Sequence, residues 1–173
     1  MEMKNVKIPF TNVGPIIINK NNSKKLLDCI WIDDKEIINN DNTRIYIITV
    51  NDEIKKIGGS LCKGGIKNTM SFYFSANTGK PSLSRFSVMK EIEKELNKNN
   101  IVEIYVSFIE PIIVEINGLF GKKKVINRLS YKESEDFCKE EYYNIHQKYP
   151  DWNWQENNNR SGYENMYKET RGN

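Results

Sequence analysis

Phenol and cationic side chains gather in one stretch of the sequence, around a glycine-rich turn. The residues are Tyr46, Lys56, Lys63, Lys67, Tyr73 and Arg85. Hydrolysis of a phosphodiester needs such side chains, because cations neutralise the charge that builds on the phosphate oxygens and a base removes a proton from water. A phenol with its ordinary pKa of about 10 is a poor base, and an adjacent lysine would favour its ionised form. These residue types therefore indicate chemistry on phosphate esters.

Other kinds of chemistry find little support in the sequence. The single histidine, His146, excludes both a Ser-His-Asp set and a histidine-rich metal site. The glycine pairs at 58–59 and 64–65 lack the Gly-Lys-Ser/Thr ending of a nucleotide-binding loop, and the dinucleotide-binding fingerprint is missing. We therefore expect no small-molecule cofactor.

The composition is typical of a single globular domain. The chain has 173 residues, enough for one core, and 28% of them are charged. Its three cysteines are widely spaced and odd in number, which argues against zinc and disulfides and favours reduced thiols in the cytoplasm. No stretch approaches the roughly 18 apolar residues of a membrane span, so we expect no membrane partner. The net charge of +3 favours no class of partner.

A β-hairpin is expected to position the first of the candidate side chains. The β-branched and aromatic segment 44–50 predicts a strand, and 53–60 predicts its returning partner after an Asn-Asp turn signal. Such a hairpin puts Tyr46 and Lys56 at one end of a sheet, beside the glycine-rich turn.

Two helices and two further strands follow the hairpin. Apolar residues at helical spacing predict a helix that begins at Ser82 or Ser84. The apolar segments 101–109 and 112–116 predict strands, and 132–148 predicts a second amphipathic helix. This order predicts an α+β fold with a small, mostly antiparallel sheet, opened by a β-hairpin and packed by helices.

The hairpin resembles that of the GIY-YIG nucleases, which carry Gly-Ile-Tyr on one strand and Tyr-Ile-Gly on the next. The corresponding tripeptides here are Arg44-Ile45-Tyr46 and Lys56-Ile57-Gly58. The first glycine and the second tyrosine are replaced, and lysine at the second position resembles small restriction enzymes of this superfamily. Pro150-Asp151-Trp152-Asn153 is similar to its Pro-x-aromatic-Asn element. The resemblance extends roughly from Thr43 to Gln155.

The resemblance implies roles for four residues. Tyr46 would be the base, or the phenol that orients the attacking water, and Lys56 would help to activate either one. Tyr73 would hydrogen-bond the phosphate. Glu135 would bind a single Mg²⁺ that contacts the scissile phosphate.

Two assignments have alternatives. By count the arginine of the superfamily falls near Lys67, whereas Arg85 offers a guanidinium at the start of a helix; the spacing slightly favours Lys67. The metal-binding glutamate is Glu135 if it lies on the inward stripe of its helix with Tyr142, or Glu141 if one counts back from the Pro-x-aromatic-Asn element. We favour Glu135.

A nuclease also needs groups that hold DNA. Cationic, amide and hydroxyl side chains contact phosphates and base edges. The candidates are Lys63, Lys67, Asn68, Thr69, Lys80, Arg85 and Asn153. The three lysines of 122–124 form either a further phosphate contact or a solvated turn. Trp152 and Trp154 are expected to cover the sheet.

The sequence therefore predicts a Mg²⁺-dependent, sequence-specific endonuclease of the type II restriction class, which cuts double-stranded DNA with a tyrosine-assisted water. Cutting both strands needs two active sites, so we expect a homodimer. The alternatives are a homing or repair nuclease of the same superfamily and a non-catalytic nucleic-acid-binding relative. Residues 41–156 would form the nuclease domain, 1–40 an accessory arm and 157–173 a polar tail.

Overall fold

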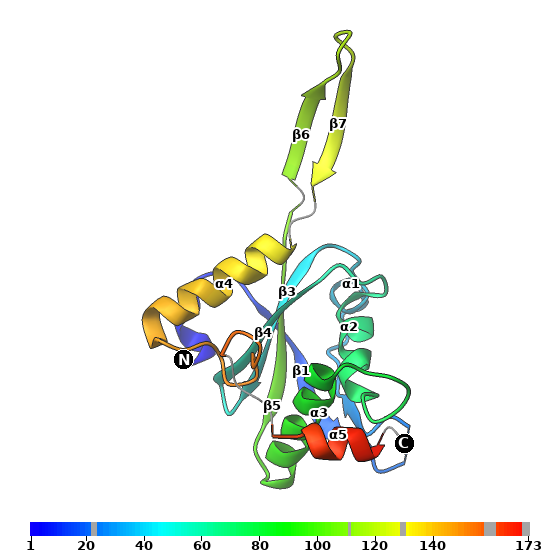
Figure 1. The fold of residues 1–173 in the computed structure, drawn as a ribbon, viewed down its shortest axis with the longest axis vertical. Coiled ribbons are helices and arrows are strands. Elements are labelled where there is room, and N and C mark those ends of the chain that lie inside the picture. The colour runs from blue at the N-terminus through cyan, green and yellow to red at the C-terminus, as the bar shows by residue number, and fades with distance from the viewer. Residues whose placement is uncertain (22–23, 111, 129–130, 158–161, 171–173) are drawn as a thin grey trace.

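A five-stranded antiparallel sheet forms the centre of the molecule (Figure 1). The computed structural model describes residues 1–21, 24–110, 112–128, 131–157 and 162–170. The strand order is β2-β1-β5-β3-β4, and each neighbouring pair is antiparallel. The strands are β1 Thr11–Ile18, β2 Leu27–Cys29, β3 Arg44–Val50, β4 Glu53–Ser60 and β5 Val102–Phe108.

The predicted β3–β4 hairpin is confirmed. Asn51 and Asp52 at its turn have φ angles of 48° and 68°. Two successive positive φ angles belong to the two-residue turn whose twist matches that of the flanking strands. β3 is buried along its whole length because it lies between β4 and β5 and is covered on both faces. Its β-branched side chains suit this position.

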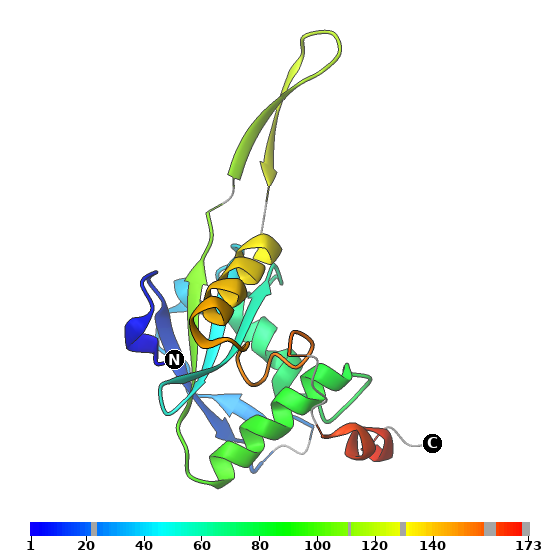
Figure 2. The ribbon, with the colours of Figure 1, turned by 60° about the vertical axis from the view of Figure 1, so that its left-hand side comes forward.

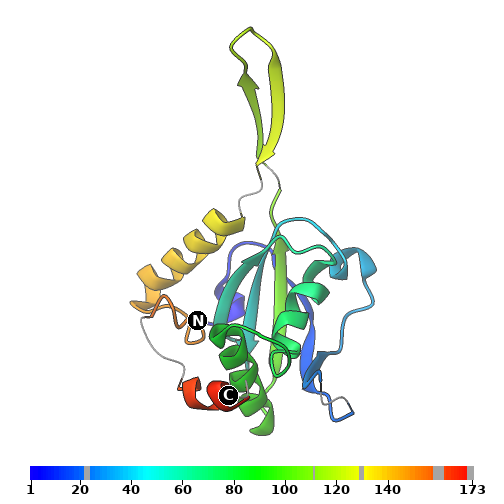
Figure 3. The ribbon, with the colours of Figure 1, turned by 45° about the vertical axis from the view of Figure 1, so that its right-hand side comes forward.

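Helices cover both faces of the sheet, which confirms the predicted α+β class (Figure 3). The helices are α1 Lys35–Ile38, α2 Gly65–Phe74, α3 Leu83–Asn97, α4 Tyr131–His146 and α5 Glu164–Thr170, after a 3-10 helix at Met3–Asn5. Ile48 faces α2 and α3 and joins a core cluster with Met70 and Met89. Ile47 points to the other face and shares a second cluster with Tyr142 of α4. Successive residues of β3 therefore build two separate cores.

The N-terminal segment is part of the sheet. Residues 1–40 were predicted to form an accessory arm, but β1 lies between β2 and β5. Val13 and Ile16 of β1 are buried in the larger core cluster. The segment is therefore held by backbone pairing and by apolar contacts, as the other strands are.

The first residues of α3 and α2 can be compared with the prediction from the sequence. The N-cap of α3 is Ser82, whose Oγ accepts a hydrogen bond from the Arg85 backbone N–H at 3.4 Å, so the first of the two predicted caps is confirmed. Helix α2 was not predicted. It begins after Gly64, whose φ of 81° only glycine adopts readily. Its polar outer face and its few aliphatic residues obscured the helical pattern.

A second hairpin projects from the body of the molecule (Figures 1 and 2). It consists of β6 Ile112–Asn117 and β7 Lys123–Arg128, which pair with each other in a separate two-stranded sheet. The sequence predicted the first of these strands but not the second, because lysines interrupt the apolar pattern of β7.

The C-terminal segment packs on the body. Trp152 is buried in the larger core cluster, as expected for a residue that covers the sheet. In the predicted polar tail, the Tyr167 hydroxyl of α5 donates to the Pro81 carbonyl at 2.7 Å. Among the described residues, no helix combines the length and apolar character needed to cross a membrane.

Candidate active site

Two phenols meet on the face of the sheet that α2 and α3 cover. Tyr46 comes from the middle of β3 and Tyr73 from the last turn of α2, and their hydroxyl oxygens are 2.7 Å apart. The rings meet edge to face with centroids 6.3 Å apart. Both side chains are buried, with 5% and 8% of their surfaces exposed. The structure thus brings together two of the predicted catalytic residues.

A glycine makes room for this pair. Gly58 lies directly opposite Tyr46 in the β3–β4 register. A Cβ atom at Gly58 would lie 2.4 Å from the Tyr46 ring and hydroxyl, closer than any side chain tolerates. The last glycine of the second tripeptide is therefore required because the phenol lies across it.

Burial dominates the electrostatics of both phenols. It raises the pKa of Tyr46 well above its ordinary value, and the neighbouring Tyr73 and the charge of Glu135 raise it further. Burial likewise raises the pKa of Tyr73. The cation that opposes both rises is Arg85. We conclude that the two phenols are protonated, contrary to the expectation that an adjacent Lys56 would favour an ionised Tyr46.

Arg85, rather than Lys67, lies with the phenols. Arg85 in the first turn of α3 lines a cavity of about 340 Å³ together with Tyr46 and Tyr73. Its guanidinium carbon lies 4.6 Å from the centre of the Phe72 ring. Lys67 lies on the exposed side of α2, where its charge helps to lower the pKa of Asp28. Helix α2, which the sequence does not predict, turns Lys67 away from the phenols, so Arg85 is the one of the two alternatives that lies with them.

The carboxylate of Glu135 reaches the same place from α4. A Cβ atom at Gly59 would lie 2.9 Å from Glu135 Oε2 and 2.8 Å from the Tyr131 ring, so a second glycine lets α4 approach β4. Glu141 is on another side of this helix and lines an apolar cavity beneath the N-terminal segment. Of the two predicted metal ligands, Glu135 is the one whose charge acts on both phenols, where it raises their pKa values.

Lys56 lies in a larger cavity next to the first. This cavity, of about 780 Å³, is lined by Lys56, Glu135 and Lys139 among others. Residues adjacent in the chain line the two cavities, since Ser84 faces the larger and Arg85 the smaller. Lys56 has 9% of its surface exposed. Burial lowers its pKa to about 8, although the charges of Glu156 and Glu135 act in the opposite direction.

Lys139 and Glu156 belong to the site but were not predicted. The Lys139 ammonium lies 2.9 Å from Glu135 Oε1 and 2.6 Å from Glu156 Oε1. These contacts raise the pKa of Lys139 despite its burial. The spacing of four residues between Glu135 and Lys139 places them on one side of α4, which is the signal that could have found the pair.

Arg44 is a structural residue of the site. It has none of its surface exposed, although it stands in a central strand. Its guanidinium donates to the Cys62 carbonyl at 2.8 Å and to Thr69 Oγ1 at 3.1 Å. Arg44 thus ties the glycine-rich loop and α2 to β3. An arginine within an otherwise apolar strand was the signal for this role.

Two predicted DNA-binding residues have structural roles instead. The Asn153 side chain accepts a hydrogen bond from the Ile57 N–H at 3.0 Å and donates to the Ile57 carbonyl at 3.1 Å, and 1% of its surface is exposed. Thr69 is also buried, and its hydroxyl bonds to Arg44, Ser60 and the Gly65 carbonyl. Neither side chain is accessible to DNA, because the packing of α2 and of the C-terminal loop encloses them.

The other DNA-binding candidates lie on the surface. Lys63 and Asn68 flank the start of α2, and the Asn68 amide donates to the Lys63 carbonyl at 2.7 Å. Lys80 is exposed in the loop before α3. These three positions remain accessible to a phosphate backbone.

Glu135 is the residue that could hold a metal ion. Among the described residues, no group of three or more His, Cys, Asp or Glu side chains comes together. Mg²⁺ is commonly held by one or two carboxylates, with water and substrate phosphate filling the other positions. The single carboxylate of Glu135, beside a cavity lined by phenols and a guanidinium, fits this mode of binding. Bound there, Mg²⁺ would neutralise charge on the phosphate.

The fold is similar to two solved structures. Restriction endonuclease HPY188I in complex with product DNA has a TM-score of 0.54 and 24% sequence identity, and the match covers 87% of this chain and 84% of that one. A mutant of bacteriophage T4 EndoII has a TM-score of 0.50 and 18% identity, over 83% of this chain and 91% of that one. At these identities the likeness is one of fold. No protein-family model and no curated protein matches the chain.

Proposed function

We propose that this chain is a Mg²⁺-dependent endonuclease that hydrolyses phosphodiester bonds of double-stranded DNA. We further propose that it belongs to the restriction enzymes of the GIY-YIG superfamily. The observation that carries the proposal is the meeting of two phenols, a guanidinium and a carboxylate around Gly58 and Gly59. The likeness in fold to a restriction endonuclease solved with product DNA supports it.

The phenols act as hydrogen-bond donors. Because burial keeps Tyr46 and Tyr73 protonated, the pair holds two hydroxyl protons; one forms the mutual hydrogen bond, and the other can be donated to an oxygen of a phosphate that enters the smaller cavity. Their mutual hydrogen bond at 2.7 Å fixes where the two hydroxyls stand before substrate arrives. Donors placed in advance stabilise charge as it develops in the transition state.

Arg85 and Lys56 supply charge and base. Arg85 lies in the same cavity as the phenols, where its guanidinium can neutralise the phosphate. Lys56 has a pKa of about 8 and therefore a substantial neutral fraction at slightly alkaline pH. We propose that neutral Lys56 accepts the proton of the attacking water, and that Glu135 holds Mg²⁺. Lys56 thus takes the role of base that the resemblance to the GIY-YIG nucleases implies for Tyr46.

Cleavage of both strands needs two copies of this site. One chain carries one such constellation among its described residues, so we propose a homodimer in which each copy cuts one strand. Sequence specificity then follows from two identical half-sites.

A non-catalytic DNA-binding relative is the second candidate. The ion pair between Glu135 and Lys139 favours it, because the carboxylate is already engaged at 2.9 Å. A metal ion would have to compete with this ammonium.

Cleavage of unmethylated phage DNA separates the two candidates. The protein is incubated with DNA in Mg²⁺ or in EDTA, alongside Tyr46→Phe, Glu135→Ala and, as a control on the same helix, Glu141→Ala. We expect discrete fragments in Mg²⁺ from the wild type and from Glu141→Ala, and loss of about 10²-fold or more in the other two.

The outcomes are distinct. Intact DNA with every divalent metal, together with retained binding in a gel shift, would leave the non-catalytic candidate. A smear instead of discrete fragments would refute sequence specificity while keeping the nuclease.

A further inference from the structure

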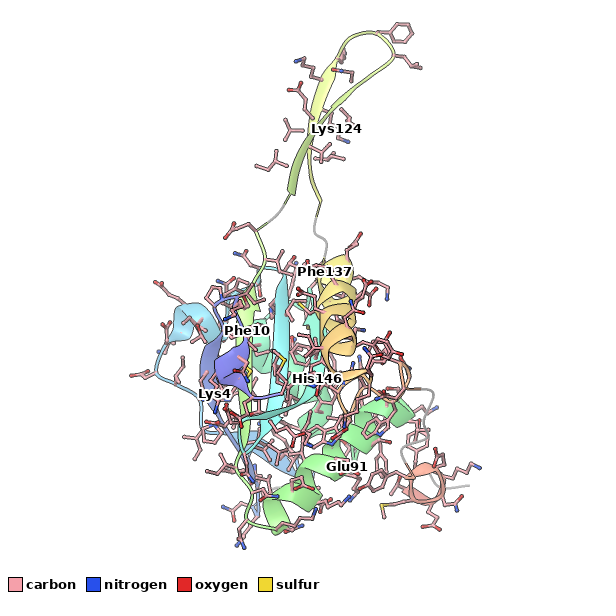
Figure 4. All side chains as sticks on the ribbon, turned by 90° about the vertical axis from the view of Figure 1, so that its left-hand side faces the viewer. Lys4, Phe10, Glu91, Lys124, Phe137 and His146 are labelled. Atoms are coloured by element: carbon pink, nitrogen blue, oxygen red, sulfur yellow. The ribbon has the colours of Figure 1, made fainter. Side chains whose placement is uncertain are left out.

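The β6–β7 hairpin projects away from the rest of the molecule in all four views (Figures 1 to 4). Its strands pair over six positions, from Ile112 opposite Arg128 to Asn117 opposite Lys123. At about 3.4 Å per residue each strand is about 20 Å long. A two-stranded hairpin has only marginal stability in water unless it packs on something. Its conformation in the working protein therefore depends on a partner.

The tip of the hairpin is apolar and fully exposed. Leu119 and Phe120 have 98% and 95% of their surfaces exposed, more than any other large apolar residue of the described chain. On the strands, Ile113 and Val125 are 69% and 61% exposed. Exposed apolar side chains thus lie on the strands as well as at the tip, and large exposed apolar surfaces mark binding sites.

Lysines follow the tip at once. Lys122, Lys123 and Lys124 are all exposed, and Figure 4 shows Lys124 on the projecting part of the hairpin. The sole acidic residue between Ile112 and Arg128 is Glu115, which pairs with Lys123 at 2.8 Å. The hairpin therefore has an apolar tip followed directly by a cluster of lysines. A partner that fits it is anionic and has a crevice that accepts apolar side chains.

The root of the hairpin adjoins the candidate active site. The hairpin is inserted between β5 and α4, and the first turns of α4 carry Tyr131 and Glu135. Figures 1 and 2 show the N-terminal end of α4 near those ends of β6 and β7 that lie closest to the body. A duplex with a phosphate near Glu135 would therefore pass within reach of the hairpin.

We propose that the β6–β7 hairpin is an arm that holds duplex DNA, with its lysines on the phosphate backbone and with Leu119 and Phe120 wedged into a groove between base pairs. The proposal rests on the proposed function. A two-stranded ribbon fits a DNA groove, and apolar side chains that enter a groove part the base steps. A second copy of the chain is the alternative partner, and light scattering of the tip variant distinguishes it from DNA.

The lysines are tested by the salt dependence of binding. Binding to a short duplex is measured by fluorescence anisotropy over a range of NaCl, without divalent metal, for the wild type and for Lys122→Gln with Lys124→Gln. The slope of log affinity against log salt should fall by about one for each lysine that contacts a phosphate. The control is Met166→Ser with Lys168→Gln on α5, at the other end of the molecule (Figure 1). Its slope should equal that of the wild type.

The tip is tested by DNA unwinding. A nicked plasmid is ligated in the presence of protein that carries Glu135→Gln to prevent cutting, with and without Leu119→Ser and Phe120→Ser. A wedge between base pairs unwinds the duplex, so the intact tip should shift the linking number of the closed circles. The serine variant should lose this shift and bind about tenfold more weakly. Both residues are exposed, so the variant should fold.

Failure of the arm and failure of the proposed function are distinguishable. If the wild type neither binds nor cuts duplex DNA, the proposed function fails. If it cuts while both hairpin variants keep the wild-type slope, affinity and linking number, the arm proposal is refuted. If the tip variant instead turns a dimer into a monomer in light scattering and its DNA binding is unchanged, the hairpin joins two copies and the arm proposal is likewise overturned.

Discussion

The β3–β4 and β6–β7 hairpins have similar local sequence and opposite surroundings. The β3–β4 hairpin is part of the central sheet. Its isoleucines alternate between the two core clusters, Gly58 faces Tyr46, and Gly59 faces Glu135. The β6–β7 hairpin has isoleucines, lysines and glycines too, but its apolar side chains are exposed. Strand-forming residues thus specify the hairpin in both cases. Contacts with the rest of the molecule decide whether the side chains of a hairpin become buried, as in β3–β4, or stay exposed, as in β6–β7.

Matched lysines in the two hairpins should show the largest contrast. Lys56→Met removes the proposed base, and we expect kcat/KM for cleavage to fall by about 10²- to 10⁴-fold. Lys124→Met in the other hairpin should weaken DNA binding by less than about tenfold and leave the single-turnover rate at saturation unchanged. Equal losses in both variants would contradict the division of roles.

The pH dependence of kcat/KM is a second way to compare Lys56 with Lys124. Lys56 has a pKa of about 8, and its neutral form is the proposed base, so kcat/KM should rise with pH through about 8 and then level. The Lys124→Met variant should keep this rise. The residual activity of Lys56→Met should lack it; a rise that persists there would point to another base.

Matched isoleucines test the packing of the two hairpins. Ile47 is 4% exposed and Ile113 is 69% exposed. Ile47→Ala should lower the free energy of unfolding by about 2 to 5 kcal/mol, because it leaves a cavity in the core. Ile113→Ala should change it by less than about 0.5 kcal/mol. Urea denaturation measures both. A large loss for Ile113→Ala would mean that the second hairpin is packed in the free protein.

Matched glycines give the smallest expected effect on stability. Gly58→Ala would place a Cβ atom 2.4 Å from Tyr46 and should cost about 1 to 3 kcal/mol. The same change in a Tyr46→Leu background should cost less, because the clash is removed. Gly118→Ala meets the Lys122 carbonyl at 3.2 Å and should cost below about 1 kcal/mol. Equal costs for Gly58→Ala in the two backgrounds would show that the phenol does not set the need for glycine.

The strongest local patterns were predictable from the sequence. The β-branched run of β3 and the Asn51-Asp52 turn identified the first hairpin, and the helical spacing of Phe86 and Met89 identified α3. The inward stripe of α4 predicted that Glu135 would meet the sheet, and its carboxylate lies against Gly59 of β4; its role as metal ligand stays a prediction. In each case a single local period carried the information.

The remainder depended on contacts that no local period encodes. Counting residues favoured Lys67 over Arg85 because α2 was not foreseen, and a helix changes the direction of every side chain on it. Burial, which governs the pKa values of Tyr46 and Lys56, is a property of the assembled layers. From the sequence, Asn153 is expected to be a polar surface residue. It is buried because the loop that carries it packs against β4.

That loop also closes the sheet on one side. β4 is the last strand of the order β2-β1-β5-β3-β4, so one row of its backbone groups lacks a neighbouring strand. The Asn153 amide occupies the N–H and carbonyl of Ile57, and the Trp152 N–H donates to the Lys55 carbonyl at 2.8 Å. Exposed strand edges recruit other chains and lead to aggregation. The loop takes the place of a sixth strand, and it protects the strand that carries Lys56 and both glycines from pairing with a neighbour.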